Sequence, residues 1–459
     1  MSFIGILVSL SLLMYGAYKG ISVLILGPAL AAAAILMSGE YSVLAGYTEI
    51  YIPEFAKYLN NLPIFFFGAI FGKVMDVSGS AKSIADFIIQ RLGKDRAILA
   101  VVLSTALLVY GGVSLFVISF TIYPIGSALF RAADVPKRFM PACIAFGAFT
   151  FATYAFPGSP QIQNALPMQY FGTTLYSAPV LGSILGVIEF TLGMWWLNHA
   201  LKKARKTGEG YGMHEDFLHF TEEENIIPGF KKSIAPIIVF FIFNLFLTYI
   251  ALPGINGDFL SQKPFNTSLS KVTGTWALII SLAFAIISAI IINRKRFKGR
   301  LITCLNEGAK DSIMPIANTG AVVGYGNVIK TLSGFNFIRD AVLGISRNPI
   351  IGAGLATTIL CGITGSGSGG LSITLEAFAE EFIQMAQASN VSLDAIHRIM
   401  AIATGGLDSL PHNGGVITII TVCHLTHRQS YKDIFVCTVI VPTIALTVGM
   451  FLAIMGLQF

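Results

Sequence analysis

Residues 358–378 read TILCGITGSGSGGLSITLEAF, a sequence in which a run of glycine and serine separates two apolar arms. The apolar region that contains this run, 349–382, is too short for two full spans, because each span takes about 20 residues. We therefore expect a re-entrant hairpin, whose two half-helices enter and leave the membrane on the same side. Two ordinary spans joined by a glycine-rich loop are the alternative. Irregular backbone at membrane depth is tolerated where it is buried in protein or lines a cavity, so the tip indicates a functional site.

Three further apolar regions are interrupted. Residues 97–130 repeat the hairpin pattern around YGGVS (110–114). Residues 138–172 and 394–427 are interrupted by FPGSPQIQN (156–164) and LDSLPHNGG (407–415). Because proline breaks the helical hydrogen-bond ladder, we expect two discontinuous membrane helices here. A simple kink is the alternative, but it does not explain the polar side chains around both prolines.

The composition indicates a membrane protein throughout. Hydrophobic types make up 54% of the 459 residues and charged types only 12%, about half the share in an average soluble protein. This excludes a disordered chain, a disulfide scaffold and an ordinary cytosolic enzyme. The five cysteines are scattered, with no metal-ligand spacing, so neither a metal nor another cofactor is expected. The net charge of +6 is attributed to basic cytoplasmic loops and not to nucleic-acid binding.

Eight of the remaining apolar regions are predicted membrane spans. The first reads as a span and not as a cleaved signal peptide, because no basic residue precedes its apolar run. Residues 62–78 and 309–328 carry polar insertions. The plain spans are 3–17, 20–38, 177–200, 232–252, 274–293 and 431–457.

The two halves of the chain resemble each other. Gly68 and Gly320, the Ser-Gly pairs at 78–79 and 333–334, and the GG[VL]S motifs at 111–114 and 369–372 are 252 to 258 residues apart. Five spans plus one hairpin make an odd number of crossings, so the second unit is predicted to be inverted relative to the first. The expected fold is an all-α polytopic membrane protein with two inverted repeats, each of five transmembrane helices and one re-entrant hairpin.

Loop charges give the expected orientation. Clusters of lysine and arginine at 91–96, 131–138, 202–206, 231–232 and 294–300 all fall on one side of this arrangement, and the positive-inside rule makes that side the cytoplasm. Both termini are then extracytoplasmic. The chain is predicted to divide into scaffold helices (1–60 and 232–300), a first-repeat transport part (61–200), a cytoplasmic linker (201–231) and a second-repeat transport part (301–459).

Four motifs carry a family resemblance. YGGVSLFVISFTIYPIGSALFRAADVPKRF (110–139), FPGSPQIQN (156–164), GSGSGGLSITLEAF (365–378) and GGLDSLPHNGG (405–415) resemble the gluconate permease family of bacteria. The resemblance implies uptake of gluconate, related sugar acids or small hydroxy acids by proton symport. It also implies a distant similarity to the ion transporter superfamily, in which two opposed hairpin tips and two broken helices enclose the substrate. In that superfamily a scaffold domain dimerises and a transport domain moves like an elevator.

Paired discontinuous helices in inverted repeats indicate a secondary transporter with its site near the midplane. A carboxylate there needs hydrogen-bond donors, which half-helix N-termini, hydroxyls and amides supply. Close helix packing is the alternative role for the small residues. The predicted substrate-binding residues are Gly111, Gly112, Ser114, Ser159, Gln161, Gln163, Asn164, Gly367, Ser368, Gly369, Gly370, Ser372, Ser409, His412 and Asn413.

Two ionisable residues in the second break are candidates for proton coupling. Asp408 and His412 are four residues apart, and ionisable groups inside a membrane are costly and usually functional. Either can exchange a proton near neutral pH. A structural Asp–His contact or a hydrated vestibule is the alternative. Weaker candidates are Glu376 and the pair Lys73 and Asp76, which we expect to neutralise each other at helical spacing.

The sequence thus predicts a transporter and not an enzyme. It would import a small hydroxy-carboxylate, such as gluconate or 3-hydroxybutyrate, by proton symport across the cytoplasmic membrane of a bacterium. The expected partners are the substrate, the lipid bilayer and a second copy of the chain, with no nucleic acid. Sodium coupling is the alternative within the class, and an anion channel is the alternative outside it.

Overall fold

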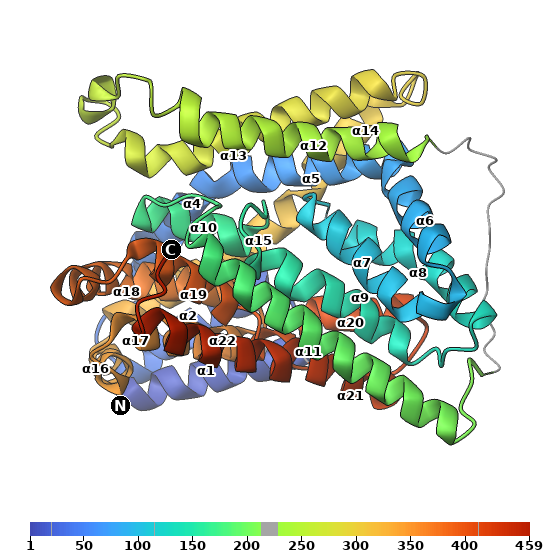
Figure 1. Cartoon of the computed structure of the whole chain (residues 1–459). Coiled ribbons are helices and arrows are strands. Elements are labelled where there is room, and N and C mark those ends of the chain that lie inside the picture. Colours follow the sequence, from blue (N-terminus) through green and yellow to red (C-terminus); the bar gives the residue numbers. More distant parts are fainter. Residues whose placement is uncertain (20, 114, 213–227, 412) are drawn as a thin grey trace.

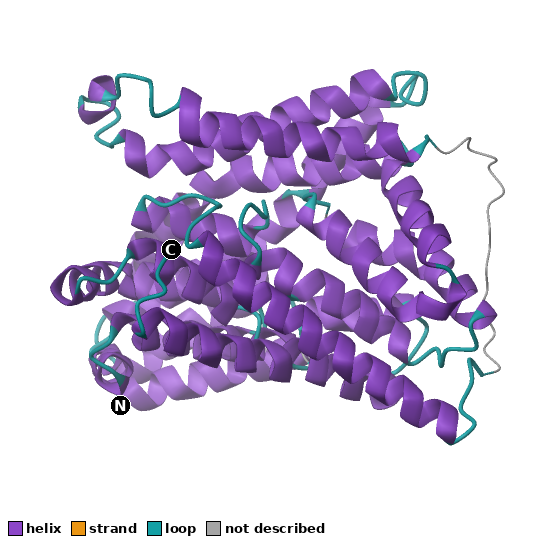
Figure 2. Ribbon diagram, in the orientation of Figure 1, coloured by secondary structure: helices purple, strands orange, loops and turns teal. Residues whose placement is uncertain are grey.

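The structure is a computed structural model that describes residues 1–459 except 20, 114, 213–227 and 412. Its described residues form α-helices and short π or 3-10 turns, with no strand among them (Figure 2). The predicted all-α class is confirmed. The predicted linker 201–231 lies partly outside the described residues, and α11 occupies its beginning.

The first half of the chain contains eleven of the labelled α-helices within the described residues. These are α1 (Ser2–Tyr18), α2 (Val23–Ser38), α3 (Val43–Gly46), α4 (Ile52–Tyr58), α5 (Leu62–Val77), α6 (Ser80–Leu92), α7 (Ala97–Tyr110), α8 (Leu115–Ala132), α9 (Phe139–Phe149), α10 (Ile162–Phe171) and α11 (Pro179–Lys206). Between them lie the short turns η1 (Tyr47–Tyr51), η2 (Leu59–Asn61), η3 (Lys94–Arg96) and η4 (Phe151–Ala155).

The second half contains the other eleven in the described part of the chain. These are α12 (Phe230–Phe246), α13 (Leu269–Ile292), α14 (Leu301–Asp311), α15 (Ile313–Thr331), α16 (Gly334–Ile345), α17 (Pro349–Thr364), α18 (Gly367–Ser389), α19 (Leu393–Ala403), α20 (Gly414–Val422), α21 (His427–Phe435) and α22 (Val441–Ile454). The short turns are η5 (Leu247–Ala251), η6 (Asp258–Ser261), η7 (Leu407–Ser409) and η8 (Val436–Ile440).

The four predicted interruptions are present. Region 97–130 forms the helical hairpin α7–α8, and region 349–382 forms the hairpin α17–α18, which continues seven residues beyond the prediction. Region 138–172 is α9, η4 and α10, and region 394–427 contains α19, η7 and α20. In Figure 1 the two hairpins lie at opposite ends of the molecule, α7–α8 at the right and α17–α18 at the left.

Two membrane segments are longer than the sequence predicts. The segment predicted at 62–78 is the end of a helical run from 43 to 77, and the segment predicted at 309–328 lies within a run from 301 to 331. Polar residues lower the hydropathy of the added turns, but Tyr51 and Tyr58 are buried, each 3% exposed. The two runs pack on each other, α5 against α14 and α4 against α15, and this protein contact compensates for the lower hydropathy.

Several helices have the length and composition of membrane spans. Within the described residues four qualify alone: Pro179–Lys206, Phe230–Ala251, Leu269–Ile292 and His427–Ile454. The pair Val43–Val77 and Ser80–Leu92, bent by 65°, makes a fifth if it counts as one span. The hairpin arms α7 and α17 have 14 and 16 residues, and the halves of the broken helices have 9 to 11, as expected for segments that end inside the protein. The hairpin arm α18 is longer, with 23 residues.

The surfaces of α12 and α13 are apolar on both sides. Phe240 faces the interior and is 0% exposed, whereas Ile242 and Ile291 on the outer faces are 59% and 64% exposed. A helix that is hydrophobic all round belongs in a protein core or a membrane. These outer faces are therefore suited to contact lipid tails.

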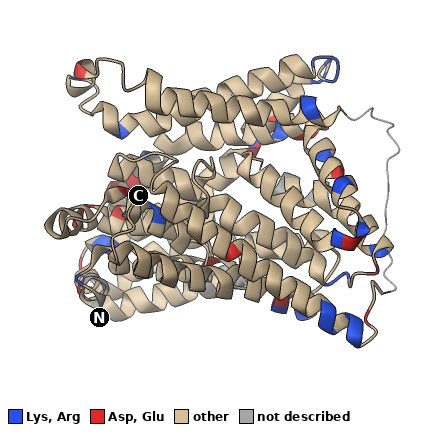
Figure 3. Ribbon diagram, viewed as in Figure 1, with Lys and Arg blue, Asp and Glu red and all other residues tan. Residues whose placement is uncertain are grey.

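Basic residues gather at one side of the molecule. In Figure 3 lysine and arginine are concentrated at the right, near the end of α11 and the loop between α13 and α14. The N- and C-termini lie at the opposite side (Figure 1). The assignment of the basic side to the cytoplasm stays a prediction.

Candidate functional site

The tip of the first hairpin packs against the first helix break. The Tyr110 hydroxyl donates to the carbonyl of Pro157 at 2.5 Å, and the Gln161 amide donates to the carbonyl of Val109 at 2.7 Å. Gly112 has a φ of +89°, and a Cβ on it would lie 3.2 Å from Cγ of Pro160. The tip and the break therefore form one junction, in which glycine at 112 allows both the turn and the close approach.

The break itself follows from local sequence. After α9, Thr150 leaves helical geometry with φ −126° and ψ −131°. Pro157 and Pro160 donate no backbone hydrogen bond, and Gly158 adopts a φ of +93°. The short π-helical turn η4 follows, and the next α-helix begins only at Ile162. The segment between them crosses the interior beside the first tip, where the Gly158 N–H donates to the carbonyl of Leu175 and the carbonyls of Pro157 and Ser159 accept from side chains.

The tip of the second hairpin packs against the second break. Gly365 ends α17 in the left-handed conformation, and the Ser366 hydroxyl accepts from the backbone N–H of Gly369, capping α18. The Asn413 amide donates to the carbonyl of Gly365 at 3.0 Å. Its oxygen accepts from the backbone N–H of Val416 at 2.9 Å, so the same side chain caps α20. One asparagine joins the tip to the broken helix.

Asp408 lies at the centre of this second junction. It is 7% exposed, and the Ser409 hydroxyl donates to its Oδ1 at 2.8 Å. A Cβ on Gly367 would lie 2.9 Å from its Oδ2, so the carboxylate touches the first residue of α18. The N-terminus of a helix carries unpaired N–H groups and a positive dipole end. Of the two coupling candidates, Asp408 is in the junction, and His412 lies outside the described residues.

A buried arginine, which the sequence analysis missed, fixes the first break. Arg398 of α19 is 0% exposed, and its five N–H groups all donate to oxygen atoms of the neighbouring first repeat. The acceptors are the carbonyls of Tyr154, Leu175 and Ser177 and the side chain of Asn164. None of these partners is a carboxylate, so the cation stays uncompensated by an ion pair. Its charge favours an anion near the break.

The neighbouring His397 completes this anchor. Its Nδ1 is 2.7 Å from the Thr173 hydroxyl, and its Nε2 is 3.3 Å from Oδ1 of Asn164. The Asn164 amide in turn donates to the carbonyls of Ser159 and Leu175. The amide nitrogen and oxygen of Asn164 therefore both have hydrogen-bond partners within the protein, and these bonds stabilise the conformation of the break. A direct contact between Asn164 and a substrate stays a prediction.

The other predicted binding residues divide into two groups. Gly111 and Gly112 are at the first tip, and Ser159 is fully buried with no hydrogen-bond partner for its hydroxyl. Oε1 of Gln163 is buried and equally unpartnered. Ser114 lies outside the described residues. An unpartnered buried oxygen retains capacity to bind a ligand.

In the second tip the predicted residues start a helix and do not form a loop. Gly367, Ser368, Gly369 and Gly370 are the first four residues of α18. A Cβ on Gly370 would lie 2.3 Å from the backbone of Cys361, so this glycine allows the hairpin arms to pack. The Ser372 hydroxyl donates to the carbonyl of Ser368 at 2.7 Å.

Lys73, one of the weaker candidates, has a partner that the sequence did not indicate. Its amine pairs with Glu307 of α14 at 2.8 Å, and mutual neutralisation of Lys73 and Asp76 stays a prediction. The close packing of α5 on α14 brings Glu307 nearer than the neighbour on the same helix.

In the described residues no group of three or more His, Cys, Asp or Glu could hold a metal ion. All five cysteines are free and buried.

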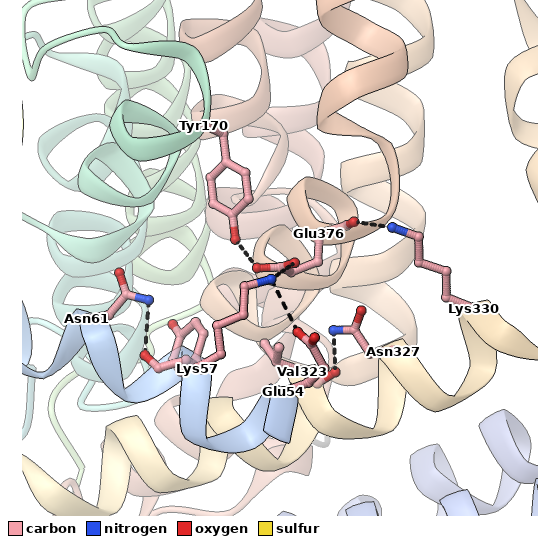
Figure 4. A network of polar contacts seen from close by, with 9 residues as sticks. Glu54, Lys57, Asn61, Tyr170, Val323, Asn327, Lys330 and Glu376 are labelled. Atoms are coloured by element: carbon pink, nitrogen blue, oxygen red, sulfur yellow. Dashed lines mark hydrogen bonds and ion pairs between the residues drawn. The ribbon is translucent and has the colours of Figure 1, made fainter. Parts of the chain in front are cut away.

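Glu376, the third weak candidate, belongs to a polar network between helices (Figure 4). Its carboxylate accepts from the Tyr170 hydroxyl of α10 and lies 3.6 Å from the Lys57 amine of α4. Lys57 also pairs with Glu54 at 3.4 Å, and Lys330 of α15 donates to the Glu376 carbonyl at 2.8 Å. The network joins the second hairpin to the long helical runs.

A cavity of about 230 Å³ lies away from both junctions. It is at the basic side of the molecule, and none of the predicted site residues lines it. Its lining includes Arg138, which is 2.6 Å from Asp433 and 2.7 Å from Glu209. The two carboxylates neutralise the positive charge of Arg138 in the cavity lining. The candidate substrate site therefore rests on the two junctions and not on this cavity.

A family model for GntP family permeases matches residues 61–456, which include both junctions. The chain belongs to the GntP permease family. A relative from Bacillus subtilis (strain 168), "Uncharacterized transporter YxjC", is 39% identical over 455 residues and aligns with 96% of each chain. An "Uncharacterized transporter" from Haemophilus influenzae is 26% identical over 239 residues, covering 49% of this chain and 54% of that protein. The chain is a membrane transporter by family, as the motifs in its tips and breaks predicted.

Proposed function

We propose that this GntP family permease imports a small hydroxy-carboxylate, such as a gluconate-like sugar acid or 3-hydroxybutyrate, by proton symport. The observation that carries the proposal is the pair of tip–break junctions, with Asp408 buried at one and the uncompensated Arg398 cation behind the other. The transported pair is the substrate and a proton, and the groups at the two junctions can bind both.

The substrate carboxylate would be bound by backbone N–H groups at the helix N-termini. The helices α10, α18 and α20 all begin at the breaks or at the second tip, and such termini favour anions without a formal cation. The Arg398 charge adds attraction at longer range. Substrate hydroxyls would bind to the unpartnered oxygens of Ser159 and Gln163.

Asp408 would couple the proton to the substrate. When ionised, its carboxylate repels a second carboxylate at the same junction, because like charges in a low-dielectric site interact strongly. A proton on Asp408 removes that repulsion, so proton and substrate each raise the affinity for the other. The first break has Gly158 and Ser159 in the corresponding region, so the coupling site is asymmetric.

The arrangement of helices supports an elevator built from inverted repeats. The second half of each broken helix packs against the opposite hairpin, α10 against α18 and α20 against α8. The hairpins lie at opposite ends of the molecule (Figure 1). In this proposal the hairpins and broken helices move against the scaffold helices of residues 1–60 and 232–300, which form a homodimer. The basic side faces the cytoplasm of a bacterium, and both termini are extracytoplasmic.

Uptake into proteoliposomes tests this proposal. Labelled gluconate and labelled 3-hydroxybutyrate are offered with an imposed pH gradient, an imposed sodium gradient, or neither. We expect accumulation of at least one substrate with the pH gradient alone. Accumulation that follows sodium and ignores pH would replace proton coupling by the sodium-coupled alternative. Flux that only equilibrates and never accumulates would favour the anion channel.

A further inference from the structure

A fully buried glutamate lies in α11 without any partner. Glu189 is 0% exposed, and neither of its carboxylate oxygens has a hydrogen-bond partner. It lies ten residues after Pro179 and seventeen before Lys206, or about 15 Å and 25 Å along the helix at 1.5 Å per residue. An ionisable group at such a depth is costly and is usually retained for function.

The face of α11 that carries Glu189 packs on aromatic rings. Gly186 and Gly193 are three and four residues away and share this face. A Cβ on Gly186 would lie 2.9 Å from the ring of Phe156, and one on Gly193 would lie 2.1 Å from the ring of Phe146. The glycines thus let two phenylalanines of the first broken helix close around the carboxyl. Such an apolar wall offers no compensation for a negative charge.

Tyr154 connects this pocket with the second break. Its hydroxyl is buried and also has no hydrogen-bond partner. A Cβ on Gly405 would lie 1.9 Å from the hydroxyl oxygen, so the hydroxyl touches the backbone three residues before Asp408. Tyr154 belongs to η4, which packs on α11, the helix that carries Glu189. Tyr154 therefore contacts the backbone near one acid and belongs to an element that packs on the helix of the other, and the two acids are in different repeats of the chain.

The surrounding charged and titratable groups are few among the described residues. The titratable and charged groups on elements packed against α11 are Tyr154 of η4, Asp394, His397 and Arg398 of α19, Tyr110 of α7, Cys143 of α9 and Cys437 of η8. The five donors of Arg398 are all used elsewhere. Asp433 contacts Trp196, which is two turns further along α11. None of them is hydrogen-bonded to Glu189.

We propose that Glu189 is a second proton-binding carboxyl of this carrier, and that the Tyr154 hydroxyl relays a proton between Glu189 and Asp408. This inference rests on the proposed proton symport. These groups are not hydrogen-bonded to one another in this conformation, so the relay requires a movement that brings the Tyr154 hydroxyl within hydrogen-bond reach of both carboxyls. In that step the Glu189 carboxyl gives its proton to the Tyr154 oxygen while the tyrosine releases its own hydroxyl proton to the Asp408 carboxylate. Glu189 is then ionised, Asp408 is protonated, and the tyrosine is a neutral phenol again.

The test separates proton coupling from substrate exchange in proteoliposomes. Glu189→Gln and Tyr154→Phe keep the shape of each side chain but remove the proton site or the relay oxygen. We expect both to slow pH-driven uptake by about a hundredfold or more, the size usual for loss of a positioned acid–base group. Counterflow exchange of labelled substrate should stay within about twofold of wild type, since no net proton movement is needed. Glu189→Asp, which keeps a carboxyl, should retain most of the pH-driven uptake.

Asn244→Leu is the matched control. Asn244 is also buried with both side-chain polar atoms unpartnered, but it lies on α12. The Asn244→Leu variant should show pH-driven uptake and counterflow close to those of wild type. Wild-type pH-driven uptake by Glu189→Gln or Tyr154→Phe would overturn the relay, and so would an equal loss of counterflow and uptake. If the wild-type protein itself shows no pH-driven uptake, the proposed proton symport is wrong. If the wild type shows pH-driven uptake and the variants behave like it, only the relay is wrong.

Discussion

The Asp408 carboxylate and the backbone of Gly367 are in direct contact, because a Cβ on Gly367 would lie only 2.9 Å from Oδ2 of Asp408. This contact joins the second break to the first turn of α18. It puts a buried acid at a helix N-terminus, where the substrate carboxylate is proposed to bind. The proposed transport mechanism therefore depends on the spacing between these two residues.

Gly367→Ala should impair transport without unfolding the protein. The added methyl group must displace Asp408 or the tip, and overpacking of this kind costs about 1–3 kcal/mol. Expressed as affinity, that is about a tenfold to hundredfold loss. Substrate binding by isothermal titration in detergent measures the loss. Gly68→Ala is the control, because nothing lies within 4 Å of a Cβ at that position. Unchanged binding by Gly367→Ala would show that the contact is irrelevant to the site.

Arg398→Lys should lower thermal stability. Lysine has three donors where the guanidinium has five, so at least two of the five hydrogen bonds are lost and at least one of the four acceptor atoms loses its bond from this side chain. Each unsatisfied buried group costs about 1–3 kcal/mol. Thermal unfolding in detergent should show a clearly lower midpoint, whereas Arg428→Lys at an exposed position should not. A wild-type midpoint for Arg398→Lys would mean that the five bonds do not hold the break.

The interruptions could be predicted from sequence because their residue types are unusual at membrane depth. Gly365 and Gly112 adopt positive φ, and Pro157 and Pro160 remove backbone donors. These effects act within a few residues of chain, so the local pattern is sufficient. The positions of both tips and both breaks agreed with the prediction for that reason.

Other parts depend on contacts between distant segments and could not be predicted. Arg398 was overlooked because its acceptors lie more than 200 residues away in the chain. Lys73 pairs with Glu307 through the packing of α5 on α14. Glu189 looks like one polar residue in an ordinary span, and only the burial of α11 shows that it has no partner.

The Lys57–Glu376 ion pair should mark the boundary between moving and fixed parts. Lys57 is on α4 and Glu376 on α18, 3.6 Å apart at the charged atoms. Cross-linking Lys57→Cys to Glu376→Cys with a short reducible reagent should stop uptake, and reduction should restore it. Cross-linking Tyr170→Cys to Glu376→Cys is the matched control, because α10 and α18 are proposed to move together. Equal uptake in both cross-linked proteins would contradict an elevator with this boundary.

Glu40 should make stability depend on pH. Its carboxylate accepts from the Ser333 hydroxyl at 2.6 Å and from the Ser333 backbone N–H at 3.0 Å. These bonds, first that of the hydroxyl, and a further bond from Ser2 hold the pKa of Glu40 below its usual value. Because the folded pKa is lowered, the stabilisation is present above the unfolded pKa, about 4.3, and is lost as the pH falls through the folded value.

Glu40→Gln should therefore lower the unfolding midpoint near neutral pH, and the difference from wild type should shrink in strong acid. Thermal unfolding as a function of pH measures this. Glu380→Gln, at an exposed position of α18, serves as the control. It should change the unfolding midpoint neither near neutral pH nor in strong acid. A difference that persists unchanged at the lowest pH would rule out ionisation of Glu40 as the cause.

The most direct test of proton-coupled transport compares two measurements on Asp408→Asn. The asparagine mimics the protonated acid, so counterflow exchange of labelled substrate should continue while pH-driven accumulation is lost. Both assays are performed on the same proteoliposomes, with wild type beside them. Retained counterflow with no accumulation is the predicted result. Full accumulation by Asp408→Asn would contradict the account and remove Asp408 from the coupling mechanism.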